Sequence, residues 1–269
     1  MFPLAFFTAL AISMALTPVM IRIAPRIGMV DMPDPRKVHA VAVPRVGGIG
    51  IVLGALASVL LWVPLQPWIA AYVFGSAGLF VFGALDDALE LGHYVKFVGQ
   101  LIAVAALVYW GDLWISHLPF FADEVGPDIG KPFTMFALVG MINAINHSDG
   151  LDGLAGGESL LSLGCMAYLG YLAGGADFVV IVGAVAGGLI GFLRYNTHPA
   201  RVFMGDAGSQ FLGFTIGVLL VYVTQVAYPT SSAALPLLLL GLPLADILGV
   251  LFQRIRGRMH WFKIGRAHV

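Results

Sequence analysis

Apolar segments long enough to cross a lipid bilayer follow one another along almost the whole chain, and they constrain its fold more than any other feature. A transmembrane helix needs about 20 largely apolar residues. Nine segments meet or approach this length, and polar loops separate them. Their expected bounds are Phe2–Ala24, Gly47–Leu65, Trp68–Leu85, Tyr94–Gly111, Phe133–Ile145, Leu154–Ala173, Phe178–Leu193, Gly208–Ala227 and Ala233–Phe252.

The composition supports a membrane protein and disfavours a soluble fold. Hydrophobic residues make up 59% of the 269 residues and charged residues only 11%, whereas a soluble domain carries about 25% charged residues. The mean hydropathy is +0.91. We therefore expect an all-α polytopic membrane protein, in which residues 1–262 form one transmembrane domain in the lipid bilayer. We expect no nucleic-acid partner.

The basic residues are distributed unequally between the two sets of loops. If the N-terminus lies outside, thirteen of the 14 Lys and Arg residues fall on the inner side and Lys131 falls on the outer side. The positive-inside rule fixes orientation from such a bias. We therefore predict an outer N-terminus, with the polar inner loops facing the cytoplasm.

The first inner loop, between Gly28 and Gly48, combines acids, prolines and basic residues. Two prolines beside two acids predict a rigid, extended turn. The basic side chains of Arg36, Lys37 and Arg45 suit phosphate, although a positive-inside loop carries such residues in any case.

Two adjacent acids, Asp86 and Asp87, follow the third apolar run directly. Adjacent carboxylates repel each other, and the C-terminal end of a helix disfavours negative charge. They are tolerated where solvent, a divalent cation or a basic partner offsets their charge. This pair alone leaves both a solvated helix end and a functional site open.

Four polar side chains lie at the end of the fifth segment and in the loop after it. Asn143 and Asn146 are three residues apart and therefore share one helix face, and Asp149 and Asp152 follow with glycines between them. Amides and carboxylates can bind the polar edges of a nucleotide, and glycine lets the backbone approach a ligand closely. Because Phe133–Ile145 is short, we expect its polar end to reach an aqueous cavity before the segment crosses fully.

The fourth cluster opens the eighth segment. Asn196 precedes this segment, and Gly205 and Gly208 flank Asp206 at its start. Free amides at a helix start bind phosphate oxygens, and a carboxylate there suits either Mg²⁺ or a simple helix cap. The four clusters share one face of the membrane, which indicates metal-assisted chemistry on a diphosphate.

These four clusters occur in the order typical of a known family. The chain resembles the bacterial polyprenyl-phosphate N-acetylhexosamine-1-phosphate transferases, a superfamily (glycosyltransferase family 4) that includes the phospho-MurNAc-pentapeptide translocase. The likeness covers about Asp31 to Asp246. Its first loop is more similar to the branch that primes O-antigen, enterobacterial common antigen or teichoic acid linkage units. His147 and Ser148 depart from the pattern, which usually has a hydrophobic and a variable residue there.

The resemblance implies that HexNAc-1-phosphate, with GlcNAc as the expected sugar, passes from UDP-HexNAc to undecaprenyl phosphate at the bacterial inner membrane, with release of UMP. It implies Asp206 as the principal ligand of Mg²⁺, or of Mn²⁺ in its place. It also implies that Asp86 and Asp87 position or deprotonate the lipid phosphate. A homodimer is compatible with it. The substrate-binding residues that it implies are Asn146, Asp149, Asp152 and Asn196 towards the nucleotide, and Lys37, His39 and Arg45 towards phosphate or sugar.

Two other classes of protein are alternatives to a transferase. A transporter also carries acids in its membrane segments, but it would place Asp86, Asp149 and Asp206 near the bilayer centre. Membrane lipid phosphatases and CDP-alcohol transferases have acid and histidine spacings that this sequence lacks.

The last seven residues, Lys263 to Val269, are predicted not to belong to the native protein. One choice of codons for them spells the start of a common short-read sequencing adapter, just where the resemblance calls for a His-rich loop and further helices. A native basic tail is the alternative. His268 is therefore not assigned to the active site, and we expect a chain that ends here to have little or no activity.

Overall fold

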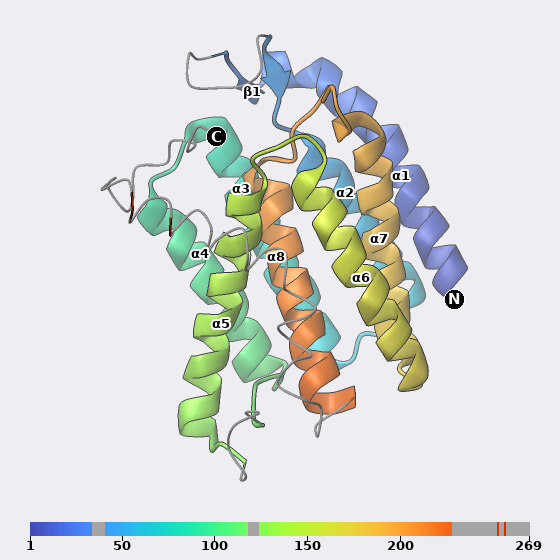
Figure 1. Cartoon of the computed structure of the whole chain (residues 1–269), viewed down its shortest axis with the longest axis vertical. Helices are drawn as coiled ribbons and strands as arrows, with labels where there is room; N and C mark the ends of the chain where they lie inside the picture. The colour runs from blue at the N-terminus through green and yellow to red at the C-terminus, as the bar shows by residue number, and fades with distance from the viewer. Residues whose placement is uncertain (34–40, 118–123, 228–251, 253–255, 257–269) are drawn as a thin grey trace.

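A computed structural model describes residues 1–33, 41–117 and 124–227, together with Phe252 and Arg256. The described residues form a bundle of α-helices (Figure 1). The helices are α1 (Phe2–Ile23), α2 (Gly47–Trp62), α3 (Pro67–Leu89), α4 (His93–Ala105), α5 (Pro127–Ser148), α6 (Leu154–Leu172), α7 (Ala176–Asn196) and α8 (Gly205–Tyr222). Short helical stretches extend three of them, namely η1 (Ala24–Arg26), η2 (Ala106–Trp110) and η3 (Val223–Ala227).

Helix α8 lies at the centre of the bundle. It packs against α2, α3, α5 and α6, and Figure 1 shows it between α3 and α5 on one side and α6 and α7 on the other. Of its most apolar window, 78% is buried, compared with 22% for α1. The N-terminal end of α8, which carries Asp206, is therefore held by helices from both halves of the chain.

The coarse architecture that the sequence predicts, an all-α membrane protein that crosses the bilayer several times, is confirmed. The strand pair described below is its one small departure among the described residues. Helix α2 is apolar but has only 16 residues. The ninth expected segment, Ala233–Phe252, lies outside the described residues except for Phe252, so the total of nine stays a prediction, as does the orientation. Five helical stretches of the described residues are long and apolar enough to span a membrane: Phe2–Arg26, Pro67–Leu89, His93–Trp110, Ala176–Asn196 and Gly205–Ala227.

The expected bounds of the fifth segment are wrong. Helix α5 has 22 residues, or about 33 Å at 1.5 Å per residue, which is long enough for a hydrocarbon core of about 30 Å, but it is not among the described helices that are also apolar enough to span a membrane. It begins earlier because Pro127 occupies the first helical position, where no amide donor is needed. It ends later because the amide of Asp149 still donates to the carbonyl of Ile145 at 3.2 Å. Asn143 and Asn146 are therefore both inside the helix.

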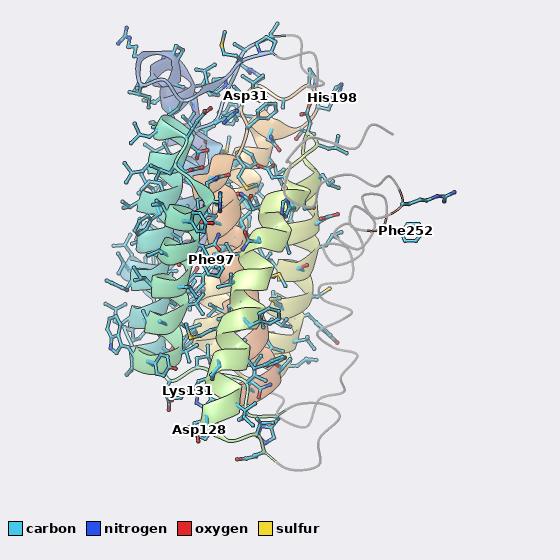
Figure 2. The ribbon with its side chains drawn as sticks, turned by 90° about the vertical axis from the view of Figure 1, so that its left-hand side faces the viewer. Asp31, Phe97, Asp128, Lys131, His198 and Phe252 are labelled. Atoms are coloured by element: carbon cyan, nitrogen blue, oxygen red, sulfur yellow. The ribbon has the colours of Figure 1, made fainter. Side chains whose placement is uncertain are left out.

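The four polar loops meet at one end of the bundle. Figure 2 shows Asp31 and His198 at this end, and Asp128 and Lys131 at the opposite end. Backbone hydrogen bonds join the first loop to the segment before α8, since the amide of Gly48 donates to the carbonyl of Met204 at 2.8 Å. No pattern in the sequence predicts the short antiparallel pair in that first loop, β1 (Val30–Asp31) with β2 (Val43–Pro44).

We expect Gly187→Ala to destabilise the packing of α7 on α1. A Cβ atom at Gly187 would lie 2.2 Å from the backbone carbonyl oxygen of Phe6, which cannot move without shifting α1. Overpacking of this kind costs about 1–3 kcal/mol. The matched control is Gly78→Ala in α3, where a Cβ meets nothing within 4 Å and alanine favours the helix by about 0.5–1 kcal/mol. Melting temperatures in detergent should fall for the first variant and hold or rise for the second. Equal melting temperatures would contradict this packing.

Candidate active site

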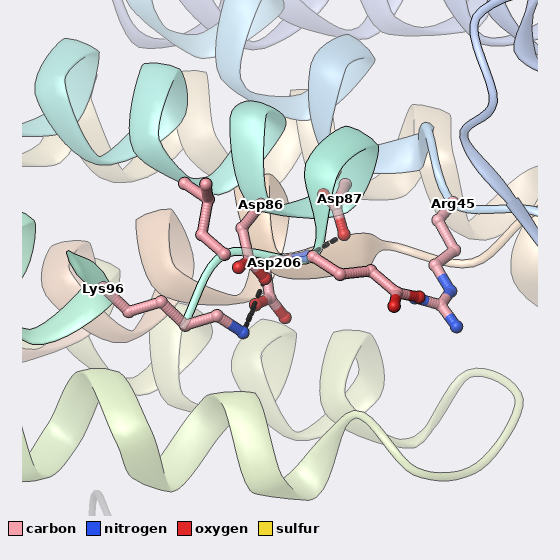
Figure 3. Close-up of a pocket in the computed structure, with 7 residues that line it drawn as sticks. Arg45, Asp86, Asp87, Lys96 and Asp206 are labelled. Atoms are coloured by element: carbon pink, nitrogen blue, oxygen red, sulfur yellow. Dashed lines mark hydrogen bonds and ion pairs between the residues drawn. The ribbon is translucent and has the colours of Figure 1, made fainter. Parts of the chain in front are cut away.

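A pocket of about 220 Å³ lies where α3 ends and where α4 and α8 begin. Four acidic and two basic side chains line it beside one leucine, so it carries a surplus of negative charge at the end of an apolar bundle. Figure 3 shows the acids of α3 and α8 pointing towards one another. The lining residues are Arg45, Asp86, Asp87, Glu90, Leu91, Lys96 and Asp206.

Lys96 joins the acids of α3 and α8. Its Nζ atom lies 2.5 Å from Asp86 Oδ2 and 2.5 Å from Asp206 Oδ2. Those two oxygens are therefore at most twice this distance apart. The other oxygen of Asp86, Oδ1, is buried and has no hydrogen-bond partner among the described residues. A buried carboxylate oxygen without a donor is unfavourable, and an added cation would satisfy it.

Asp87 binds the start of α8. Its Oδ1 accepts a hydrogen bond from the amide of Asp206 at 2.9 Å, and its Oδ2 accepts one from the amide of Ala207 at 3.1 Å. A negative charge is unfavourable at the C-terminal end of its own helix and favourable at the N-terminal end of another. Asp87 thus acts as a helix cap supplied by a different helix.

This cap corrects one expectation about the glycine-flanked start of α8. The sequence predicts free amides at this helix start that could bind phosphate, but the Asp87 carboxylate binds those of Asp206 and Ala207. Gly205 allows the contact, because it has a φ of +73° and a Cβ there would lie 2.6 Å from Asp87 Oδ2. A side chain at this position would be strained and would push Asp87 away.

Asn146 extends the site to α5. Its Nδ2 donates to Asp206 Oδ1 at 2.9 Å and to Ser209 Oγ at 2.7 Å. Asp206 therefore receives hydrogen bonds through both oxygens, from Asn146 and from Lys96. Helices α3, α4, α5 and α8 all contribute to this cluster.

Two further predicted residues, Asp152 and Asn196, belong to a second group in the neighbouring loops. Asp152 Oδ2 accepts from the amide of Ala200 at 3.0 Å and lies 3.0 Å from His198 Nδ1. Asn196 accepts from the amide of Gly153 at 2.9 Å and donates to the carbonyl of Val202 at 2.9 Å. Both side chains hold loop backbone in place, and neither lines the pocket.

The remaining predicted residues are placed as follows. Arg45 lines the pocket and forms an ion pair with Asp31. Asp149 follows α5 directly, is half-buried and does not line the pocket. Lys37 and His39 lie outside the described residues.

Lys96 is the main residue to which sequence reasoning gave no role beyond membrane orientation. A usable signal was present, since it is the sole Lys or Arg within the predicted span Tyr94–Gly111. A charge near the end of an apolar span requires a partner or water, and the closest acids along the chain, Asp86, Asp87 and Glu90, are separated from it by one short turn.

The side chains fit a magnesium ion that depends on its substrate for most of its ligands. The described residues hold no group of three or more His, Cys, Asp or Glu side chains arranged around one metal position. With Asp87 bound to backbone amides, Asp86, Glu90 and Asp206 remain among the pocket acids, and Asp86 and Asp206 are the two that share Lys96. Mg²⁺ is typically held by one or two carboxylates together with substrate phosphates and water, so two carboxylates suffice.

Comparisons with known proteins converge on one family. A family model described as glycosyl transferase family 4 matches residues 69–224. A "Probable undecaprenyl-phosphate N-acetylglucosaminyl 1-phosphate transferase" of Bacillus subtilis is 35% identical, over 98% of this chain and 75% of the relative. Two further relatives are named "Undecaprenyl-phosphate alpha-N-acetylglucosaminyl 1-phosphate transferase". The one from Yersinia pestis is 34% identical, over 96% of this chain and 72% of the relative. The one from Escherichia coli K12 is 30% identical, over 92% of this chain and 70% of the relative.

We expect the two adjacent acids to differ in their effect on stability. Asp87→Ala leaves the amides of Asp206 and Ala207 without their acceptor, which costs about 1–3 kcal/mol. Asp86→Ala removes a carboxylate with an unpartnered oxygen and leaves Lys96 paired with Asp206, so its effect on stability should be small. Melting temperatures of both variants in detergent, without substrate or divalent cation, test this difference. An equal loss of stability would mean that Asp87 does not act as the cap of α8.

Proposed function

We propose a function from the premise that this chain belongs to glycosyl transferase family 4, which the match over residues 69–224 and relatives at 30–35% identity establish. The chain transfers N-acetylglucosamine 1-phosphate from UDP-N-acetylglucosamine to undecaprenyl phosphate and releases UMP. This reaction initiates a cell-surface glycan of the O-antigen, common antigen or teichoic acid linkage type.

The observation that carries this proposal is the charged pocket at the helix ends. Two carboxylates from α3 and α8 surround one ammonium from α4. A water-soluble nucleotide sugar and the headgroup of a membrane lipid can both reach the end of a helical bundle. Apolar helix faces below the pocket suit the hydrocarbon chain of the lipid.

The transfer itself replaces one phosphorus–oxygen bond with another. An oxygen of undecaprenyl phosphate attacks the phosphorus that carries the sugar. The bond from this phosphorus to the UMP phosphate breaks, and UMP leaves with the electron pair. Both substrates are anionic, so the site must supply positive charge, and Lys96 and Arg45 are the basic side chains that line the pocket.

The acids divide into two roles. Asp86 and Asp206 would hold Mg²⁺, with Mn²⁺ as a substitute, and the bound ion would neutralise charge on the diphosphate. Asp87 fixes the backbone at Asp206 and is a positioning residue. Asp86, with its free buried oxygen, is also the acid best suited to position or deprotonate the lipid phosphate.

The nucleotide is proposed to lie towards the loop after α5. Asn146 and Asp149 face it, while Asp152 and Asn196 shape the loop backbone through the hydrogen bonds described above. Lys37 and His39 remain proposed phosphate or sugar contacts from the first loop.

The position of the acids supports a transferase over a transporter. Asp86 lies in the last turn of α3, Asp206 in the first turn of α8, and Asp149 just beyond α5. A transporter would hold its acids near the middle of its helices.

We further propose that the protein lies in the bacterial inner membrane with its site facing the cytoplasm, because basic residues gather on the cytoplasmic side of membrane proteins. Lys131 lies at the opposite end of the bundle from the site. The other described basic residues lie at the end that carries the site: Arg22, Arg26, Arg45, Lys96, Arg194 and Arg201.

A direct assay tests the substrate assignment. The protein, expressed from its complete gene and purified, is incubated with undecaprenyl phosphate, Mg²⁺ and one of a panel of UDP-sugars, and UMP release is measured. We expect UMP release with UDP-N-acetylglucosamine, dependent on the lipid phosphate. Release that does not need the lipid would indicate a hydrolase, and release only with another UDP-sugar would overturn the sugar assignment.

Asp206→Asn should abolish most turnover while the protein still inserts and folds. The amide keeps the size of the side chain but binds Mg²⁺ weakly. Residues that only support a metal ligand change affinity or activity by about 10–100-fold, so a direct ligand should cost at least that much. The matched control, Asp128→Asn, changes an acid at the opposite end of the bundle and should retain activity. Near-normal turnover of Asp206→Asn at low Mg²⁺ would contradict the ligand assignment.

A further inference from the structure

Three amide side chains form a connected layer next to the active-site cluster. They are Gln100 of α4, Asn143 of α5 and Gln210 of α8, and we call them the amide layer. Asn143 Nδ2 donates to Gln100 Oε1 at 2.9 Å, and Gln100 Nε2 donates to Gln210 Oε1 at 3.4 Å. Gln100 is 3% exposed and Gln210 is 1% exposed, whereas Asn143 is half-buried.

The spacing of these residues matches the active-site cluster helix by helix. Gln100 lies four residues after Lys96, and Gln210 lies four residues after Asp206. Asn143 lies three residues before Asn146, on a helix of opposite direction. Residues three or four apart lie on one face of a helix. The amide layer is therefore about one helical turn, or roughly 5.4 Å, further into the bundle.

The surroundings of the layer are apolar. The next helical turns place buried side chains there, among them Val104, Val139 and Phe214. Amides in such an environment need hydrogen-bond partners, and Asn143 Nδ2 also donates to the carbonyl of Val139 in its own helix at 2.8 Å. A sliding or rotation of α4, α5 or α8 would separate them, whereas packed leucines tolerate small shifts. Hydrogen bonds between membrane helices add little stability on average, so the effect of the layer lies in alignment.

We propose that Gln100, Asn143 and Gln210 are positioning residues that set the register of α4, α5 and α8, and so bring Lys96, Asn146 and Asp206 together. Gln100 is the central member because it bonds to both of the others. The register does not depend on any reaction, but its consequence for turnover rests on the proposed function.

A distance measurement tests the register directly. Spin labels are attached to cysteines at Tyr94, in the first turn of α4, and Leu151, just after α5, because both are exposed, at 77% and 60%. Cys165, an exposed free cysteine, is replaced by serine. Gln100→Leu should shift or broaden the distance distribution between the labels. The matched control is Gln225→Leu, which removes a glutamine that accepts hydrogen bonds from the amides of Ser116 and His117 and lies outside the layer.

Turnover then tests the consequence. Gln100→Leu and Gln210→Leu should each lower kcat by about 10–100-fold, since small displacements of reacting groups can cost this much. The double variant should lose no more than the worse single variant, because both break the same connection. Gln225→Leu should keep the kcat of the folded protein.

Each outcome decides one part of the proposal. A label distance in Gln100→Leu equal to that of the unsubstituted chain and of Gln225→Leu would overturn the register. A changed distance with unchanged kcat, or losses in kcat that multiply in the double variant, would overturn its link to the reaction. If the unsubstituted protein, expressed from its complete gene, releases no UMP from any UDP-sugar, the proposed function fails, while the label distances still decide the register.

Discussion

The carboxylate of Asp87 bound to the first amides of α8 is the interaction on which the rest of the site depends. Asp87 lies at the C-terminal end of α3, where the helix dipole disfavours an acid. The start of α8 provides two amides that compensate for this position. The contact fixes Asp206 beside Asp86, and both acids form ion pairs with Lys96 at the start of α4. Without this cap, the acids would repel one another across an open end of the bundle.

Such close contact requires glycine at the positions where the neighbouring helices meet the start of α8. A Cβ at Gly48 of α2 would lie 2.2 Å from the amide nitrogen of Gly208, and one at Gly83 of α3 would lie 2.5 Å from the Cα of Ala207. These glycines let α2 and α3 approach the backbone of α8 directly. These two glycines therefore position the polar end of α8 through backbone contacts on two sides, in addition to the side-chain contacts of Asp87.

Much of the fold could be predicted from the sequence because apolar length alone identifies most helices. The alternation of loops also placed Asp86, Asp87 and Asp206 at a common end, where the structure brings them together. The length of α5 was missed because Asn143, Asn146 and Pro132 interrupt the apolar pattern without interrupting the helix. The cap by Asp87 and the ion pair of Lys96 with Asp206 connect residues more than 100 positions apart, and no local pattern contains that information. Asp152 and Asn196 bond to loop backbone and do not line the pocket, an arrangement that depends on the tertiary path of residues 197–204, and their contact with the nucleotide stays a prediction.

A structure of the protein with UDP-N-acetylglucosamine and Mg²⁺ would test whether one pocket, built from the ends of α3, α4 and α8, binds the diphosphate. We predict that the diphosphate lies within this pocket, in contact with Lys96, that Asp86 and Asp206 hold one ion, and that Asp87 keeps its hydrogen bonds to α8. A diphosphate bound elsewhere, with Lys96 still paired to both acids, would contradict it.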